Sequence, residues 1–216
     1  MMRKLLSVFT AVVLYMSLTA CWDTGEDKDK VSSLTQYVSY FPDKVGTEWI
    51  YNGFAEYGHT VKLDKIENTA DGKVEYTING KVADMSGGEA KGDFNVSLRY
   101  IFSGDNVKEV VVKGEKLPHK IKELIVLKEP ISKGNTWTQK AAIDGVNTQI
   151  NAEILEIKEN DQDGKTIKVQ YTGDVEHMPG GVYREVRVFK EKTGLISFEN
   201  TFNRDIEFNY SLFHFN

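Results

Sequence analysis

Apolar and polar residues alternate along most of the chain after residue 41. The alternation is most regular over residues 94–102, where every second side chain is apolar. A period of two places successive side chains on opposite faces of a β-strand, with one face buried and the other in solvent. This part of the chain is therefore predicted to be all-β and antiparallel. The clearest apolar positions are Phe94, Val96, Leu98, Tyr100 and Phe102; Val74, Tyr76 and Ile78; Ile167, Val169 and Tyr171; and Ile206, Phe208, Tyr210 and Leu212.

Pairs of turn-forming residues separate the alternating segments. Asn-Gly and Asp-Gly pairs supply the positive φ angles that tight hairpins need. Their spacing of roughly ten residues predicts about eleven or twelve strands. Two segments stay undecided: residues 34–40 suit a short helix or a first strand, and residues 120–128 suit a buried strand or a short helix. The turn pairs are Asp71-Gly72, Asn79-Gly80, Ser103-Gly104, Asp163-Gly164, Gly180-Gly181 and Thr193-Gly194.

A Pro-x3-Gly-x2-Trp motif occurs twice with an offset of 88 residues. Each copy is followed by a strand-like segment, a polar turn with Asp-Gly-Lys, and a second strand-like segment. Chance similarity between β-rich segments is the alternative to an internal duplication. Duplication predicts two related β units, residues 41–128 and 129–216, whose antiparallel sheets share or pack one core. The landmarks are Pro42, Gly46 and Trp49; Pro130, Gly134 and Trp137; and, at an offset of 87, Phe102 and Phe189.

The last alternating segment is apolar in both phases. Phe213 and Phe215 fall on the face opposite Phe208 and Tyr210. A strand that is apolar on both faces is buried on both sides or borders a cavity. We therefore expect this strand in the core or beside a ligand cavity.

The first 20 residues differ in kind from the rest. Arg3 and Lys4 precede an uncharged, almost wholly apolar stretch over residues 5–18, which ends in Leu18-Thr19-Ala20-Cys21. The stretch is too short to be a comfortable membrane-spanning helix and has the layout of a secretory signal.

Leu18-Thr19-Ala20-Cys21 resembles the lipobox of bacterial lipoprotein precursors. The resemblance implies cleavage between Ala20 and Cys21, with diacylglycerol on the Cys21 thiol and often a further acyl chain, such as palmitate, on the new amino terminus. Two or three acyl chains hold a protein stably on a membrane. It also implies a signal peptide over residues 1–20, and residues 21–40 then form the lipidated cysteine and a flexible tether. The alternatives are a plain secretory signal with a chance cysteine and an uncleaved anchor helix.

Charge and composition narrow the function classes. The chain has 27 Lys and Arg, 32 Asp and Glu, and a net charge of −5. An acidic chain is not expected to bind nucleic acid. Cys21 is the single cysteine, so no internal disulfide can form. Since an acidic protein is repelled by an anionic membrane, the lipid is expected to provide the attachment to the extracytoplasmic face of the cell membrane.

Catalytic and metal-binding motifs are not evident in the sequence. The four histidines, His59, His119, His177 and His214, are far apart and do not have the spacing of a zinc site. Residues 161–166 resemble the start of a calcium loop but lack the downstream glutamate, so a solvated hairpin is favoured. We predict no catalytic residue, no metal ligand and no cofactor.

The segment PDKVGTEWIY, from Pro42, also resembles the opening of many uncharacterised envelope lipoproteins, and this resemblance implies no activity. We predict an extracytoplasmic lipoprotein with a non-enzymatic role, which binds a lipophilic ligand or an envelope protein. The alternatives are an envelope hydrolase with a site hidden from the sequence and a structural or stress-related surface protein.

Overall fold

The computed structural model describes residues 38–160, 164–176, 178–203 and 206–216. These residues form twelve β-strands and two short 3-10 helices, which confirms the all-β prediction and the expected number of strands. The elements are β1 (Glu48–Gly53), η1 (Phe54–Glu56), β2 (Gly58–Asn68), β3 (Val74–Val82), β4 (Asn95–Ser103), β5 (Asn106–Lys113), β6 (Glu123–Lys128), β7 (Thr136–Ile143), β8 (Val146–Asn160), β9 (Gly164–Asp174), η2 (Pro179–Gly181), β10 (Val182–Lys190), β11 (Gly194–Asn203) and β12 (Ile206–Phe215).

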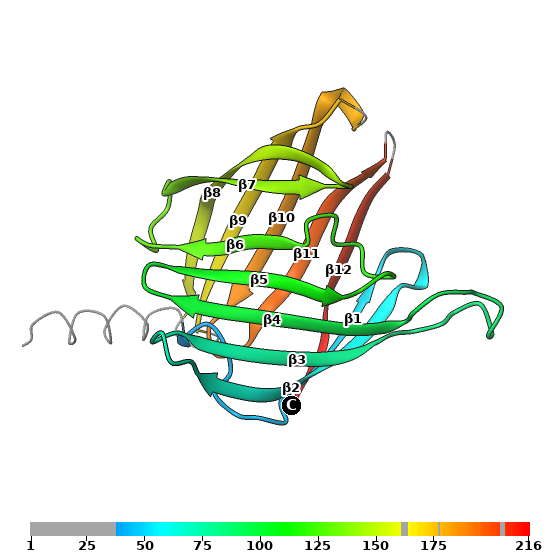
Figure 1. Cartoon of the computed structure of the whole chain (residues 1–216), viewed down its shortest axis with the longest axis horizontal. Coiled ribbons are helices and arrows are strands. Elements are labelled where there is room, and N and C mark those ends of the chain that lie inside the picture. The colour runs from blue at the N-terminus through cyan, green and yellow to red at the C-terminus, as the bar shows by residue number, and fades with distance from the viewer. Residues whose placement is uncertain (1–37, 161–163, 177, 204–205) are drawn as a thin grey trace, which may run out of the picture.

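All twelve strands belong to one antiparallel sheet in the order β6-β5-β4-β3-β2-β1-β12-β11-β10-β9-β8-β7. The sheet bends back on itself, so that β2–β6 cross in front of β8–β11 in Figure 1. The inward faces of both halves contribute to one hydrophobic core. Strands from β1 to β6 and from β7 to β12 therefore share one core, as the sequence predicts.

The two edge strands, β6 and β7, meet through side chains and not through a regular ladder. The Gln139 side chain accepts a hydrogen bond from the Ile125 backbone N–H (2.8 Å) and donates one to the Ile125 carbonyl (3.1 Å). The Trp137 indole N–H donates to the same carbonyl (3.3 Å). Side chains on β7 thus satisfy backbone groups of β6 that would otherwise be an open edge.

The repeated Pro-Gly-Trp motif has the same local structure in both copies. Gly46 and Gly134 have φ angles of 97° and 83°, which favour glycine. Trp49 and Trp137 follow in β1 and β7 with buried side chains. The strands β1, β2 and β5 begin 88 residues before β7, β8 and β11. The common origin of the two halves stays a prediction.

One predicted turn is wrong. Asn79-Gly80 lies inside β3, which continues to Val82. A Cβ atom on Gly80 would lie 1.9 Å from the Thr60 carbonyl oxygen of β2. The glycine therefore permits a close approach of two backbones and does not form a hairpin turn. The undecided segment after residue 120 contains the strand β6, which begins at Glu123.

The expected burial of β12 on both faces is also wrong. Phe213 is 73% exposed and Phe215 is 37% exposed. The ladder with β1 pairs Ile50 with His214 and Tyr51 with Leu212, so that Phe213 is skipped in a β-bulge. A bulge breaks the strict alternation of a strand, and alternation alone could not reveal this one.

No helix in the described part of the chain is long and apolar enough to cross a membrane. The signal segment, Cys21, the tether up to residue 37, residues 161–163 and His177 lie outside the described residues.

Candidate functional site

Three charged side chains occupy inward positions of otherwise apolar strands. On β5, Glu109 lies between the buried residues Val107 and Val111. On β10, Glu185 and Arg187 lie in the same inward row as Tyr183 and Phe189, and their exposed fractions are 0%. Burial of charges is costly unless they are paired and hydrogen-bonded.

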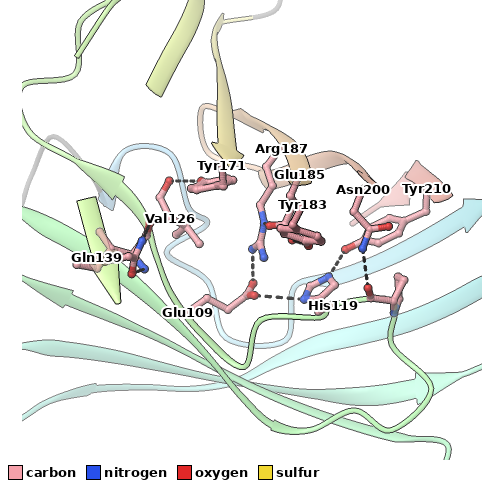
Figure 2. Close-up of polar contacts among 12 residues, drawn as sticks. Glu109, His119, Val126, Gln139, Tyr171, Tyr183, Glu185, Arg187, Asn200 and Tyr210 are labelled. Carbon is pink, nitrogen blue, oxygen red and sulfur yellow. Dashed lines mark hydrogen bonds and ion pairs between the residues drawn. The ribbon is translucent and has the colours of Figure 1, made fainter. Parts of the chain in front are cut away.

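The three charges pair with one another in the interior (Figure 2). Arg187 Nη1 lies 2.9 Å from Glu109 Oε2, and Arg187 Nε donates a hydrogen bond of 2.6 Å to Glu185 Oε1. The Tyr100 hydroxyl donates to Glu109 Oε2 (2.7 Å), and the Tyr183 hydroxyl donates to Glu185 Oε2. Tyrosines from β4 and β10 thus complete an ion-pair network that joins the two halves of the sheet.

His119 extends the network from the segment between β5 and β6. Its Nδ1 lies 3.2 Å from Glu109 Oε1, and its Nε2 lies 2.7 Å from the Tyr210 hydroxyl on β12. The imidazole stacks on the Phe198 ring with the centroids 4.6 Å apart. The Asn200 side-chain amide donates to the Pro118 carbonyl (2.8 Å) and thereby fixes the backbone beside His119.

The network favours the charged forms of Glu109 and Arg187. Burial raises the pKa of Glu109, but the charges of Arg187 and His119 lower it more, with help from hydrogen bonds from His119 and Tyr100. The pKa of Glu109 therefore lies well below its usual range. Burial lowers the pKa of Arg187, whereas Glu109 and Glu185 raise it more, and the net shift is upward. Glu109 and Arg187 are therefore expected to remain ionised at neutral pH.

A small chamber lies beside this network. The space free for the centre of a water molecule is about 20 Å³, which is room for about one water. Two lining residues, Tyr100 and His119, also bond Glu109, so the chamber and the charge network are continuous. Mainly aromatic and aliphatic side chains line the chamber: Phe41, Trp49, Tyr51, His59, Val61, Ile78, Leu98, Tyr100, Leu117, His119, Leu195 and Tyr210, with Gly194.

His59 lines the chamber as a neutral side chain. It is 5% exposed and stacks on the Tyr51 ring at 4.5 Å. Burial, with a smaller contribution from His119, lowers its pKa to about 3. Its Nδ1 atom is buried and makes no hydrogen bond, and neither does the buried Tyr57 hydroxyl, whose ring lies 5.4 Å from that of His59. Buried polar atoms without partners commonly mark a bound water or a ligand site.

A thin wall separates the chamber from the surface. Leu117 and His119 line the chamber, and the same two residues line a surface groove together with Lys120 and Asp144. They belong to the irregular segment between β5 and β6. A local movement of this segment would connect the chamber with solvent.

Tyr210, His119 and Glu109 form a hydroxyl–imidazole–carboxylate series, an arrangement that can move protons. All three side chains are almost fully buried. In the described ranges, no group of three or more His, Cys, Asp and Glu side chains is placed to hold a metal ion. Aromatic side chains make up most of the chamber lining, and the charged side chains of the network lie behind Tyr100 and His119.

The structure brings together some of the histidines that the sequence separates. The rings of His59 and His119 lie 4.9 and 6.1 Å from that of Tyr210. His214 is exposed on β12. Sequence analysis missed Glu109, Glu185 and Arg187 as site residues. Their signal was a charged residue in the buried phase of an alternating strand.

The comparisons with known proteins identify the fold. No protein-family model and no curated protein matches the chain. Two solved structures are similar: a candidate lipoprotein from Parabacteroides distasonis (TM-score 0.50) and a candidate exported protein with a YMCC-like fold from Bacteroides fragilis (TM-score 0.51). Each is 12% identical, and each match covers 82% of this chain and 98% of the other. At this identity, the likeness shows a shared fold alone.

Proposed function

We propose that the protein is a lipid-anchored binding protein on the extracytoplasmic face of the cell membrane, and that the chamber between the two halves of the sheet holds a small ligand. The observation that carries the binding role is the aromatic chamber, in which His59 Nδ1 is buried without a hydrogen-bond partner. The role is non-enzymatic and needs no cofactor.

The lipobox supports the location. Cys21 follows Leu18-Thr19-Ala20 after a charged and then apolar segment. The descriptions of the two similar structures, a candidate lipoprotein and a candidate exported protein, agree with export.

The size of the chamber restricts the ligand. Room for about one water is far less than the roughly 150 Å³ of a protein cavity that binds benzene. A long acyl chain does not fit this closed form, so the lipophilic cargo expected from the sequence is narrowed to a small molecule. The ligand enters when Leu117 and His119 move.

Two changes test location and binding separately. Cys21→Ala should abolish both lipidation and cleavage after Ala20, since the thiol is the lipid acceptor; mass spectrometry of the protein from cell membranes measures both. Normal processing of that variant would refute the anchor.

For the chamber, native mass spectrometry of the mature protein released from membranes should show a bound small molecule. Leu117→Trp, which fills the chamber, should remove it. Val112→Trp on β5 is the control, because Val112 is 53% exposed and does not line the chamber. A ligand that persists in Leu117→Trp would place binding outside the chamber.

The Tyr210–His119–Glu109 series favours a hydrolase as the second candidate function. Wild-type protein that hydrolyses 4-nitrophenyl acetate, with loss of that activity in Tyr210→Phe, would support it. Equal rates for both proteins would exclude this series as the source.

A further inference from the structure

Three apolar side chains are exposed at the end of the sheet where β1 begins and β12 ends. Phe213 is 73% exposed, Val45 is 52% exposed and Phe215 is 37% exposed. The loop that contains Val45 leads into β1, and at the start of β1 the backbones of Glu48 and Asn216 exchange hydrogen bonds of 3.1 and 3.3 Å. We call Val45, Phe213 and Phe215 the basal surface.

The described chain enters the fold beside the basal surface. Val38 and Phe215 line the same groove. The backbone N–H of Lys192 donates a hydrogen bond of 2.7 Å to the Ser39 carbonyl, which fixes the entry point to the turn between β10 and β11. Val38 follows the predicted lipid acceptor, Cys21, by 17 positions, and a flexible chain of that length has a root-mean-square end-to-end distance of about 20–25 Å. A lipid on Cys21 would therefore hold the basal surface close to the bilayer.

The exposure of Phe213 follows from the β-bulge in β12. The ladder with β1 pairs Leu212 with Tyr51 and His214 with Ile50, so that Phe213 is skipped. A bulge changes the direction in which a side chain points, and bulges are frequent next to functional sites. An exposed aromatic ring gains free energy when it leaves water for an apolar medium. The bulge therefore presents an apolar ring that is available for such a medium.

Charge opposes contact with an anionic membrane less at this end than over the whole protein. The charged groups that line the groove are Lys44, Lys192, Asp43 and the terminal carboxylate of Asn216. Two ammonium groups thus balance two carboxylates, whereas the chain has a net charge of −5. An anionic bilayer attracts basic groups near its surface and repels acidic ones, so a balanced region is repelled least.

We propose that the basal surface docks on the lipid bilayer, with the rings of Phe213 and Phe215 at the boundary between headgroups and acyl chains. The proposal rests on the lipid anchor of the proposed function and adds an orientation to it. Burial of the three apolar side chains drives the contact, while the lipid on Cys21 keeps the surface within reach.

The docked orientation determines which side of the protein faces the aqueous phase. His119 in the chamber wall contacts Tyr210, and Tyr210 pairs with Gly53 at the opposite end of β1 from the basal surface. The wall of Leu117 and His119 therefore lies away from the bilayer. A chamber ligand then enters from the aqueous phase and not from the membrane.

Spin labels on the lipidated protein in phosphatidylcholine vesicles test the docking. Lipid occupies the Cys21 thiol in the proposed mature protein, so an engineered cysteine is its single free thiol. Labels on Phe213→Cys, Phe54→Cys and Val112→Cys compare three exposed positions, of which the last two lie outside the basal surface. Electron paramagnetic resonance measures their collisions with oxygen, which concentrates in bilayers, and with a nickel chelate, which stays in water. The ratio of oxygen to nickel collisions should be several times higher at residue 213 than at residues 54 and 112.

A label at residue 45 separates docking from an effect of the label at residue 213. In Val45→Cys the oxygen-to-nickel ratio should be as high as in Phe213→Cys. Addition of Phe213→Ser should lower it to the ratio of Phe54→Cys, and the exposure of Phe213 makes this substitution compatible with the fold. Phe54→Ser is the matched control and should leave the ratio at residue 45 unchanged.

Vesicle flotation and mass spectrometry measure the anchor independently of the labels. A protein that floats with the vesicles, but whose label at residue 213 has the same ratio as those at residues 54 and 112, would overturn the docking and leave the anchor. A protein without lipid on Cys21 that does not float would overturn both. Spin–spin broadening between labels at residue 213 would overturn the bilayer as the occupant and assign the basal surface to contact between two copies of the chain.

Discussion

The inward rows of β4 and β10 occupy comparable places in the two halves of the sheet, yet their chemistry differs. At an offset of 87 residues, Leu98 and Tyr100 on β4 correspond to Glu185 and Arg187 on β10. All four side chains are buried, with exposed fractions of 6% or less. The flanking positions remain apolar or aromatic in both strands.

The difference shows that the fold does not require charges in this row. β4 packs its row by apolar burial and one tyrosine hydroxyl. β10 holds an ion pair that needs Glu109, a residue from the other half, to satisfy the Arg187 guanidinium. Buried ion pairs are weak evidence for stability. Stability alone therefore does not account for the buried charges of β10.

The largest expected loss of stability comes from a substitution that removes only one partner of the buried ion-pair network. Arg187→Met should lower the free energy of unfolding by about 3–5 kcal/mol, because two buried carboxylates lose their counter-charge. Urea unfolding followed by circular dichroism measures the loss. Arg184→Met is the control on the same strand: Arg184 faces outward, half-exposed, to Glu199 at 2.8 Å, and its loss should cost less than about 1 kcal/mol. Similar losses for both variants would contradict the difference between the two faces of β10.

A smaller loss of stability is expected on acidification, and we assign it to His59. The corresponding residue at an offset of 88, Asn147, is exposed. The pKa of His59 is lowered from 6.5 to about 3 in the folded protein. Between these pH values the unfolded chain binds a proton that the folded chain does not, so stability falls as the pH falls. The slope is about 1.4 kcal/mol per pH unit, or about 2 kcal/mol from pH 6.5 to 5.

Urea unfolding at both pH values should show this loss in the wild type and a much smaller one in His59→Gln. Asn147→Ala should keep the wild-type loss. The pKa of Glu109 is lowered in the folded protein, so its contribution to stability is lost only in stronger acid. Glu109 therefore does not affect the comparison between pH 6.5 and 5. An unchanged loss in His59→Gln would assign the acid sensitivity to another group.

The smallest loss of stability is expected when residues 185 and 187 on β10 are replaced by the residue types of their β4 counterparts and Glu109 on β5 is also made apolar. The combination Glu185→Leu, Arg187→Tyr and Glu109→Leu should unfold within about 1 kcal/mol of the wild type, since replacement of a whole buried ion-pair network is often nearly neutral. A loss as large as that of Arg187→Met would show that the charges stabilise the fold.

The strands were predictable because alternation and turn residues act locally. Ser103-Gly104 and Thr193-Gly194 do separate consecutive strands. Asn79-Gly80 failed because contact with β2, and not local turn preference, selects glycine at residue 80. The bulge at Phe213 depends on the register with β1, a partner distant in sequence.

The charge network was less predictable because its members come from four strands (β4, β5, β10 and β12) and one connecting segment. The alternation alone could have identified Glu109, Glu185 and Arg187, because each occupies an inward position of a strand whose other inward residues are apolar or aromatic. Sequence could not show that His119 would meet Tyr210, 91 residues away. That contact exists only because the bent sheet brings β12 opposite the segment after β5. The predicted absence of a zinc site and of enzymatic activity stays a prediction.

The ladder between β1 and β12 pairs Trp49 with Phe215, two residues separated by nearly the whole folded region. On the export route that the lipobox predicts, β1 emerges from the translocation channel first and waits for β12. Local hairpins can form as they emerge, but the pairing of β1 with β12 carries a large loop-closure cost and completes last. Until β12 pairs, an apolar face and the free edge of β1 are exposed to chaperones and proteases, so folding of the sheet is complete only when its last ten residues have joined it.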